Sequence, residues 1–584
     1  MVQRTQRSDV GPLSPVVGAL SSGRRETLAW RCKRSVCVSA MAETIADLLA
    51  ARVGDDRVGL FFEDRTWTWG EVVEESLARA ELLRQSGLAG RHIGVLLDNL
   101  PEYVFLLGAA AVTGSVIVGA NDTRRGEALA GDVRHTDCAV MLTDASKASL
   151  LDGADVGAPI RLVDRTDWLD EVRCHRGVPL PEPRPADDAL FLLVFTSGST
   201  GAPKAVRVTQ GRSVRMMAGA AAVYTEADVL YCAMPMFHLN ALMGSLFPGL
   251  SAGAKVVLKR RFSASEFLGD VRAHGCTSFN YVGRALSYIL AQPPSYQDAD
   301  NALVFCVGAE ASTPDRREFR RRFGCYVVEG YTSSEGGVSI HPFAGMPADA
   351  LGRPPDGMDV AIIDPETVEE CARAQFGPGR LLLNPTEAIG EIVRRDSNAS
   401  FEGYYANDEA DALRTRNGWF WSGDLGYRDD EGTFYFAGRG DDWLRVDGEN
   451  FAAAPVEAIL ARHLEVAAAV VFAVPDPRTG DEVMAALELK GSAAFDADAF
   501  GAFLEAQPDL GTKWAPRYVR VVEAIPLTGT GKLERKALRA DRWQTPDPVW
   551  WRRGRALEYR RLSGDEIREL EHEFEGSGRG HLLA

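Results

Sequence analysis

The 584-residue sequence lacks a CxxC pair, an internal repeat and an excess of positive charge. Its nine cysteines are scattered and odd in number, which predicts reduced thiols in a reducing, cytoplasmic compartment. The 65 Lys and Arg residues are outnumbered by 82 Asp and Glu residues, so the formal net charge is −17. We therefore expect no nucleic-acid partner, and we expect any anionic ligand to be held by a few well-placed cations.

Uninterrupted apolar runs are also scarce. Residues 1–40 contain seven Lys or Arg and lack the apolar stretch of a signal peptide. They are interpreted as a basic, disordered extension or as sequence upstream of a start at Met41, with a targeting arm as the alternative. Residues 103–120 are nearly apolar and reach the lower limit for a membrane span. Gly114 divides them, which favours a buried helix followed by a buried strand over residues 115–118.

What the sequence does contain is typical of an α/β protein. Hydrophobic residues make up 46% and charged residues 25%, which excludes a wholly disordered chain, a collagen and a multi-span membrane protein. Thr313 and Pro314 resemble an N-cap followed by proline in the first turn, so they predict a helix through Phe323. That helix would join strands 303–307 and 325–328 as a βαβ unit. The other predicted strands of this part are 93–97, 139–142, 190–195 and 255–258.

The pattern of predicted strands, helices and turns changes along the chain, and these changes predict the domain boundaries. After residue 390 it has short strands with turn residues, and from 454 to 538 it has a smaller α/β pattern. The predicted parts are an extension (1–40), a large N-terminal domain of sheets and helices with a β-rich subdomain (41–440), a small mobile α+β domain (441–545) and a C-terminal extension (546–584). In that last region, Trp543, Trp550, Trp551 and the basic residues 552–555 either contact a lipid surface or dock on the large domain.

The first chemical motif follows a predicted strand. Residues 196–204 read Thr-Ser-Gly-Ser-Thr-Gly-Ala-Pro-Lys and offer bare backbone N–H groups, hydroxyls and one cation. Such a loop suits a triphosphate, with an ordinary polar hairpin as the alternative. It is not a Walker A loop, because no GxxxxGK[ST] is present and the residues after Lys204 predict another strand.

The second motif, residues 327–337, also follows a predicted buried strand. Ligands of open α/β sheets lie beyond the carboxyl ends of strands. Tyr331 could stack on a purine and Glu335 could bind Mg²⁺, with a rim aromatic and a solvated carboxylate as the alternatives.

The third motif combines Asp424, which precedes a turn, with Arg439 one predicted strand later. A carboxylate can accept both hydroxyls of a ribose, and a nearby arginine can hold the same sugar or a phosphate. Taken alone, Ser-Gly-Asp at 422–424 is ordinary turn chemistry.

The fourth motif is a Gly/Thr loop that ends in Lys532. A lysine at such a tip is a mobile point charge, although most lysines of this kind are solvated surface residues.

These four motifs, in this order and spacing, resemble those of the adenylate-forming superfamily over roughly residues 45–540. Residues 259–294 and 443–460 resemble the very-long-chain acyl-CoA synthetase and fatty-acid transport protein branch. The resemblance implies an enzyme that converts a carboxylic acid and Mg·ATP to an acyl-adenylate and then passes the acyl group to CoA. It also implies that a fatty or other hydrophobic acid is the substrate. Peripheral membrane contact is left open, and the sequence does not predict the oligomeric state.

The resemblance also implies roles for individual residues. The 196–204 loop would hold the β- and γ-phosphates, Glu335 would hold Mg²⁺ with help from Thr196, and Lys532 would reach the reacting oxygens during adenylation. Tyr331 would stack on adenine. The nucleotide-binding residues implied in this way are Thr196, Ser197, Gly198, Ser199, Thr200, Gly201, Lys204, Gly308, Ala309, Glu310, Tyr331, Ser334, Asp424, Arg439 and Lys532.

Further roles concern the acyl group and CoA. His238 matches a family histidine beside the acyl carboxylate, with a core histidine as an equal alternative. Asp441 matches the hinge about which the small domain would rotate, bringing Gly448, Glu449 and Asn450 to the site for CoA transfer. The predicted acyl-pocket residues are Met236, Leu239, Tyr281, Val282, Gly308 and Val338.

The sequence also departs from the family pattern. The family usually has Tyr-Gly-x-Thr-Glu where this chain has Thr332 and Ser334 between Tyr331 and Glu335, so backbone freedom is reduced at 332. Two alternatives to a CoA ligase remain: an acyl-AMP ligase that loads a carrier-protein thiol, and a lipid-binding or transport protein with little catalysis.

Overall fold

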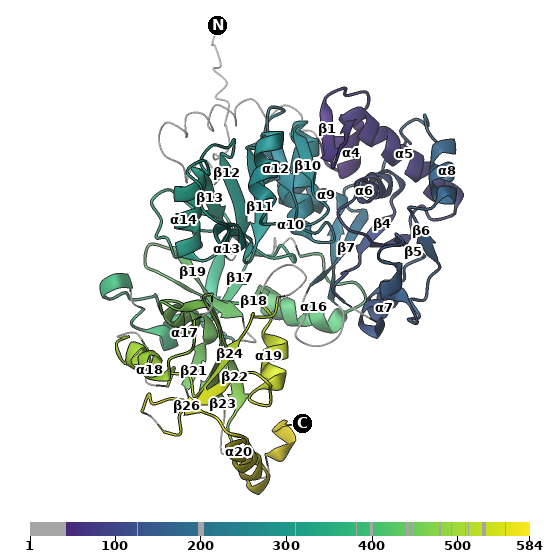
Figure 1. Ribbon diagram of the computed structural model, residues 1–584. Helices are drawn as coiled ribbons and strands as arrows, with labels where there is room; N and C mark the ends of the chain where they lie inside the picture. Colours follow the sequence, from purple (N-terminus) through teal and green to yellow (C-terminus); the bar gives the residue numbers. More distant parts are fainter. Residues whose placement is uncertain are drawn as a thin grey trace. The chain divides into compact units, whose positions relative to one another are not determined.

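The computed structural model describes residues 42–583 with short gaps, and the chain divides into two compact units (Figure 1). The first unit comprises Met1–Pro355 and Asn398–Arg416, and the second comprises Asp356–Ser397 and Asn417–Ala584. Within 42–584 the residues not described are 125, 197–203, 310, 381, 397–400, 440–442, 447–448, 478–480, 492, 508–509, 512, 528–532, 555, 578 and 584. The domain boundary near residue 440 stays a prediction.

The first unit contains two large sheets. The seven-stranded sheet has the order β13-β12-β11-β9-β10-β1-β2 and is parallel except for the β1–β2 hairpin. The six-stranded sheet has the order β6-β5-β3-β4-β7-β8 and is parallel except for the β7–β8 hairpin. Their strands are β1 (Val58–Phe62), β2 (Arg65–Thr68), β3 (His92–Leu96), β4 (Val116–Gly119), β5 (Val140–Thr143), β6 (Ile160–Leu162), β7 (Leu190–Thr196), β8 (Lys204–Thr209), β9 (Val229–Cys232), β10 (Lys255–Leu258), β11 (Ser278–Val282), β12 (Phe305–Ala309) and β13 (Tyr326–Glu329).

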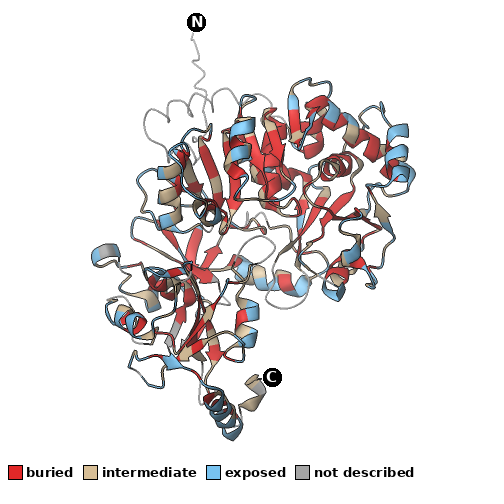
Figure 2. Ribbon diagram, viewed as in Figure 1, coloured by how far each residue is buried: buried red, intermediate tan, exposed pale blue. Residues whose placement is uncertain are grey.

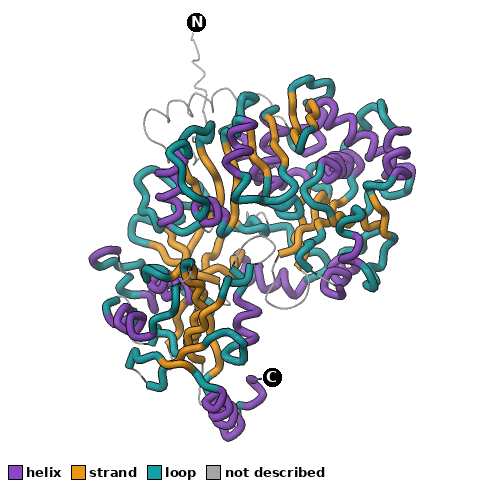
Figure 3. The backbone as a smooth tube through the Cα atoms, in the orientation of Figure 1, coloured by secondary structure: helices purple, strands orange, loops and turns teal. Residues whose placement is uncertain are grey.

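Helices cover these sheets, and one apolar core joins residues of both sheets with residues of the helices (Figures 2 and 3). Because parallel strands are covered on both faces, they are apolar almost throughout, as β5 and β4 show. The helices are α4 (Ile45–Ala50), α5 (Trp69–Gln85), α6 (Pro101–Thr113), α7 (Gly126–His135), α8 (Thr166–Cys174), α9 (Gln210–Ala221), α10 (Leu239–Ala241), α11 (Phe247–Ala252), α12 (Phe267–His274), α13 (Ala285–Leu290), α14 (Thr313–Phe323) and α16 (Asp408–Arg414).

The apolar segment 103–120 is a helix followed by a strand, as predicted. Helix α6 ends at Gly114, whose φ of 69° is in the left-handed region that glycine adopts without a steric penalty. Strand β4 follows and is buried along its whole length. Among the described residues, every helix is too short or too polar to cross a bilayer.

The predicted βαβ unit is also present, because β12 and β13 are parallel neighbours joined by α14. The N-cap of α14 was predicted at Thr313, one residue after its position in the structure. Ser312, with extended backbone angles, accepts a hydrogen bond from the Asp315 backbone N–H at 3.1 Å, which makes Thr313 the first helical residue. Either hydroxyl could have capped this helix, and the backbone conformation at Ser312 selects between them.

The second unit contains a four-stranded antiparallel sheet, a two-stranded hairpin and a five-stranded sheet. The smaller α/β pattern predicted from 454 to 538 is confirmed, whereas β18 has nine residues and is longer than the short strands predicted after residue 390. The strands are β16 (Val360–Ile363), β17 (Gly390–Arg394), β18 (Phe420–Arg428), β19 (Phe434–Arg439), β20 (Trp443–Val446), β21 (Glu449–Ala452), β22 (Val466–Pro475), β23 (Asp481–Leu489), β24 (Tyr518–Val522), β25 (Val549–Trp551) and β26 (Arg560–Arg561). The helices are α15 (Pro385–Ala388), α17 (Ala453–Leu460), α18 (Ala497–Glu505), α19 (Arg535–Asp541) and α20 (Gly564–Gly576).

The C-terminal residues extend the five-stranded sheet. Strands β25 and β26 add to its β24 edge, and Phe574 of α20 packs in the core below it. Trp543 and Trp551 are 1% and 4% exposed and belong to that same core, so neither predicted position, on lipid or on the large domain, describes them. The sequence shows the apolar character of these side chains, whereas only the added strands show what covers them.

Candidate active site

The predicted phosphate loop connects the two strands of a hairpin. Thr196 ends β7 and lies opposite Lys204, the first residue of β8. The two residues that flank the loop 197–203 are therefore neighbours at one end of the hairpin. Residues 197–203 lie outside the described part of the chain. The prediction that a strand, and not a helix, follows Lys204 is confirmed. Because β7 runs parallel to β4, Thr196 lies at the carboxyl end of the sheet, where ligands of open α/β sheets bind.

Glu335 is buried in the loop between the short strands β14 (Tyr331–Thr332) and β15 (Ser339–Ile340). Its carboxylate Oε1 accepts a hydrogen bond from the Tyr404 hydroxyl at 2.8 Å. The Arg414 Nε donates in turn to the Tyr404 hydroxyl oxygen at 3.2 Å. The predicted alternative for Glu335, a solvated loop carboxylate, does not fit a side chain that is only 8% exposed.

Arg212, in the first turn of α9, also holds the loop that contains Glu335. It is fully buried, and its Nη2 donates to the Ser334 carbonyl at 2.7 Å while its Nη1 donates to the Arg207 carbonyl. Gly336 has a φ of 67°, and a Cβ there would lie 2.7 Å from the Arg212 Nη2. Burial lowers the pKa of Arg212, and the charges of Glu402 and Glu335 oppose that shift.

The residues around Tyr404 pair with β8 and connect Glu335 to the phosphate-loop hairpin. Tyr404 forms an antiparallel bridge with Val206, two residues beyond Lys204. The Tyr405 N–H donates to the Ala205 carbonyl at 2.8 Å. Burial raises the pKa of Tyr404, so it is a neutral hydrogen-bond donor at physiological pH.

Tyr404, Arg414 and Arg212 were not predicted as site residues. Tyr404 lies 69 residues and Arg212 lies 122 residues from the positions they contact in the Glu335 loop. Both come from segments that lack a recognisable chemical motif, so the sequence carried no local signal for them.

Glu335 and Thr196 fit the Mg²⁺ that the resemblance implies. No group of three or more His, Cys, Asp or Glu side chains able to hold a metal occurs among the described residues. One buried, fixed carboxylate is nevertheless what Mg²⁺ requires when phosphate oxygens and water complete its shell. The Thr196 hydroxyl lies at the end of the neighbouring hairpin strand and is of the right chemical type.

The predicted adenine edge lies at the end of β12. Gly308 pairs with Tyr281 on one side and with Glu329 on the other. A Cβ on Gly308 would lie 2.6 Å from ring carbons of Tyr281, so glycine is required there. The Tyr281 hydroxyl donates to the Glu329 Oε1 at 2.7 Å, and the Ala311 N–H donates to the same oxygen at 2.8 Å. Glu310 lies outside the described residues.

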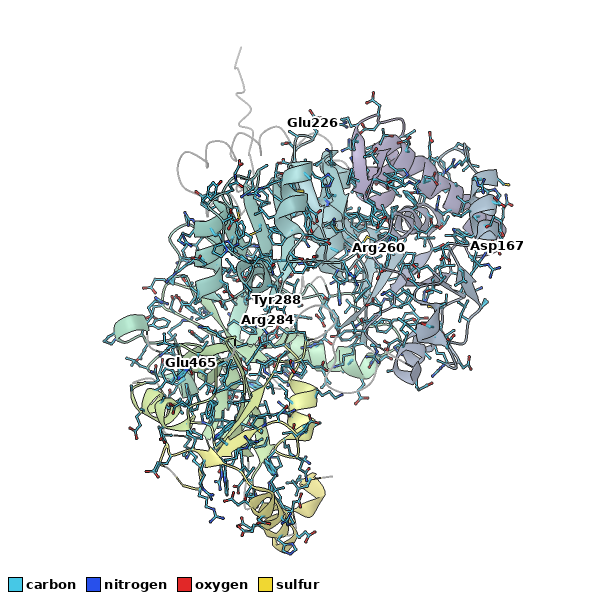
Figure 4. The ribbon with its side chains drawn as sticks, viewed as in Figure 1. Asp167, Glu226, Arg260, Arg284, Tyr288 and Glu465 are labelled. Atoms are coloured by element: carbon cyan, nitrogen blue, oxygen red, sulfur yellow. The ribbon has the colours of Figure 1, made fainter. Side chains whose placement is uncertain are left out.

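The predicted acyl-pocket residues are buried or half-buried, as a pocket wall requires. Met236 lines a very small cavity together with Gly119 and Phe237. His238 is half-buried, and its ring lies 4.5 Å from that of Phe237. Its role beside the carboxylate stays a prediction. At the end of β11, the Arg284 guanidinium lies over the Tyr288 ring at 5.4 Å (Figure 4).

In the second unit, Asp424 and Arg439 are opposite each other on β18 and β19. The Asp424 N–H donates to the Ser422 hydroxyl at 3.1 Å. The Gly423 N–H donates to the Glu391 Oε1 at 2.6 Å, which anchors this turn to β17. Asp424 and Arg439, which are predicted to share one ribose, are therefore neighbours across the two strands, and the Arg439 side chain lies outside the described part of the structure.

Several predicted residues lie outside the described part of the chain: Lys532, Asp441 and Gly448. Glu449 and Asn450 belong to β21, and their side chains are not described. Their roles stay predictions.

Comparison with known proteins places the chain in a family. Residues 49–405 match the AMP-binding enzyme family, and residues 455–532 match the AMP-binding enzyme C-terminal domain. The chain therefore belongs to the AMP-binding enzymes, the adenylate-forming superfamily that the sequence resembles.

Relatives within this family are CoA ligases. The chain is 49% identical to the steroid-22-oyl-CoA synthetase of Rhodococcus jostii, covering 92% of this chain and 99% of the relative. It is 43% identical to the medium/long-chain fatty-acid–CoA ligase FadD17 of Mycobacterium tuberculosis, covering 87% of this chain and 98% of that protein. The o-succinylbenzoate CoA synthetase of Bacillus subtilis, solved with ATP and magnesium, is 25% identical with a TM-score of 0.71, covering 85% of this chain and 99% of the other.

Proposed function

We propose that this protein is an AMP-forming acyl-CoA ligase whose substrate is a steroid side-chain carboxylic acid. The activity on a hydrophobic acid, with ATP, Mg²⁺ and CoA, follows from the family and from relatives that are 41–49% identical over most of the chain. The identity of 49% to a steroid-22-oyl-CoA synthetase, over 99% of that relative, carries the finer proposal.

The chemistry requires charge neutralisation more than acid–base catalysis. A carboxylate is already ionised at neutral pH and needs no base before it attacks the α-phosphate of ATP. It does need cations that cancel the repulsion between two anions. Bound Mg²⁺ supplies part of this neutralisation.

The residues of the chain divide this work between them. Glu335 and Thr196 would hold the metal, and Lys204 with the loop before it would hold the terminal phosphates. Lys532 would reach the carboxylate as the acyl-adenylate forms and would withdraw by rotation at Asp441 before CoA attacks. Asp424 and Arg439 would hold the ribose.

A medium- or long-chain fatty acid is the second candidate substrate. Its support is the 43% identity to a medium/long-chain fatty-acid–CoA ligase. A carrier-protein thiol as acceptor has less support, because the relatives named above are CoA ligases. A cytoplasmic location remains part of the proposal, and peripheral membrane contact remains open.

A panel of acids tests the proposal. Purified protein is supplied with ATP, Mg²⁺, CoA and either C22 steroid acids or fatty acids of graded length, and AMP production is measured. We expect the highest kcat/KM with the steroid acids. Higher kcat/KM with a linear fatty acid would select the second candidate, and no acid-dependent AMP would overturn the ligase assignment.

Lys532→Ala separates the two half-reactions. We expect adenylation to fall by about 10²–10³-fold, as for other placed electrostatic donors, while thioester formation from supplied acyl-adenylate persists. Lys536→Ala, an exposed lysine on α19, is the matched control and should adenylate normally. Normal adenylation by Lys532→Ala would remove that residue from the mechanism.

A further inference from the structure

The hydroxyl of Tyr404 lies between two charged groups of the first unit. It donates to the Glu335 Oε1 at 2.8 Å and accepts from the Arg414 Nε at 3.2 Å. We propose that Tyr404 is a positioning residue that fixes the Glu335 carboxylate for binding Mg·ATP. This inference rests on the metal-binding role of Glu335 in the proposed function.

The direction of the hydrogen bonds follows from the chemistry of arginine. A guanidinium only donates, so the contact with Arg414 uses a lone pair of the phenol oxygen. The phenol proton is then directed to Glu335, which accepts it best as an ionised carboxylate. The order Arg414, Tyr404, Glu335 therefore sets the orientation of the carboxylate.

This arrangement determines which oxygen faces a metal. Tyr404 engages Oε1, so Oε2 can bind a cation while the existing hydrogen bond is kept. Groups that orient a metal ligand in this way typically contribute about 10–100-fold in metal affinity.

Tyr404 is itself held rigidly. Its N–H donates to the Asp411 Oδ1 at 2.7 Å, and its ring packs edge-on against Phe401 with centroids 5.2 Å apart. Asp411 and Arg414 both belong to α16, so one short helix fixes the backbone of Tyr404 and the direction of its hydroxyl. The bridge to Val206 ties the same residue to β8, which follows the phosphate loop.

A hydrogen bond with a purely structural role is the rival explanation. It predicts a loss of stability with no particular link to the metal. Tyr405 supplies a matched control, because it is the next residue in the chain and its hydroxyl donates to another carboxylate, Asp137 Oδ2, also at 2.8 Å.

The test compares Tyr404→Phe with Tyr405→Phe in ATP binding by calorimetry, with Mg²⁺ at graded concentrations and with EDTA. We expect Tyr404→Phe to weaken Mg·ATP binding about 10–100-fold and to leave metal-free ATP binding unchanged. The Mg²⁺ concentration that half-saturates pyrophosphate release should rise by a similar factor. Tyr405→Phe should match the wild type in both measurements.

A second variant and an independent readout complete the test. Arg414→Gln retains the Tyr404 hydroxyl but removes the cation that directs it, so a smaller shift in the same direction is expected. Equal loss of ATP binding with and without Mg²⁺, or an unchanged Mg²⁺ dependence in a folded Tyr404→Phe variant, would overturn the inference. Calorimetry uses no acid and no CoA, so the result is independent of whether the proposed substrate is correct.

Discussion

Several charged side chains are buried in the first unit, and hydrogen bonds or ion pairs compensate two of them, Arg79 and Arg52. Arg79 makes a two-point ion pair with Glu102, at 3.1 and 2.6 Å. Arg52 donates to the Leu250 carbonyl at 2.8 Å. Such pairs keep a buried charge tolerable because they replace the hydrogen bonds that water would have made.

Asp132 on α7 is less well compensated, and this predicts a pH effect. Its carboxyl is 1% exposed and lies 2.8 Å from the Arg124 Nε. Burial raises the pKa of Asp132 to about 6, and Arg124 and His135 only partly oppose the shift. The folded chain therefore binds this proton more tightly than the unfolded chain, so the contribution of Asp132 to stability is complete below about pH 4 and is lost as the pH rises through 6.

Asp132→Asn should remove that pH dependence, because an amide does not titrate. The free energy of unfolding of the variant relative to wild type should rise by on the order of 2–3 kcal/mol between pH 4 and pH 6.5. Thermal or urea unfolding of the first unit at a series of pH values measures this difference. Asp152→Asn, which removes an exposed carboxyl in the same unit, is the control, and parallel curves for Asp132→Asn and wild type would contradict the prediction.

Several helices of this protein begin at a side chain that accepts a hydrogen bond from a free N–H group of the first turn. Thr44, Thr68 and Ser563 each form a capping box with an acidic residue three positions later. Ser312 caps α14 alone, and Asp315 lies in the first turn of that helix. Because α14 joins β12 to β13, this cap lies between the predicted adenine edge and the Glu335 loop.

Ser312→Ala should destabilise the first unit by about 1 kcal/mol, since the Asp315 N–H loses its acceptor. Ser312→Asp keeps an acceptor at the same place and should stay within a few tenths of a kcal/mol of wild type. Chemical denaturation measures both variants. Equal stability of Ser312→Ala and wild type would show that the cap contributes nothing.

The chain as a whole has a separate set of apolar cores in each unit. The second unit is stabilised by apolar clusters on both faces of its five-stranded sheet, and β25 and α20 supply residues to one of them. Residues after the end of the matched C-terminal family domain at 532 are therefore part of this unit's core. Units with their own cores commonly unfold in separate steps.

Phe574→Ala should consequently affect one unfolding step and leave the other unchanged. The side chain is fully buried, so its loss should cost about 3–5 kcal/mol in the second unit. Differential scanning calorimetry should show one transition at a lower temperature and one unchanged. Leu464→Ala, which truncates an exposed side chain of the same unit, should leave both in place, and a shift of both transitions by Phe574→Ala would show that the units unfold together.

Much of the fold could be predicted because its signals are local. The division of 103–120 at Gly114, the strand after Lys204 and the βαβ unit around α14 each depend on residues adjacent in sequence. The N-cap of α14 was predicted one residue too late, at Thr313 instead of Ser312. By sequence alone the two neighbouring hydroxyl side chains are equally suited to capping the helix. The tryptophans near the C-terminus were misplaced because composition does not show which surface covers an apolar side chain.

From the sequence alone follow the order of the four motifs, the family and the residues predicted to meet ATP, because each motif consists of residues that lie close together in the chain. Only the tertiary structure shows that Glu335 is buried, that Tyr404 and Arg414 orient it, and that Arg212 holds its loop. Those contacts join segments 69 and 122 residues apart, and hydrogen bonds of that kind depend on how strands and helices pack, which no local pattern of residues encodes.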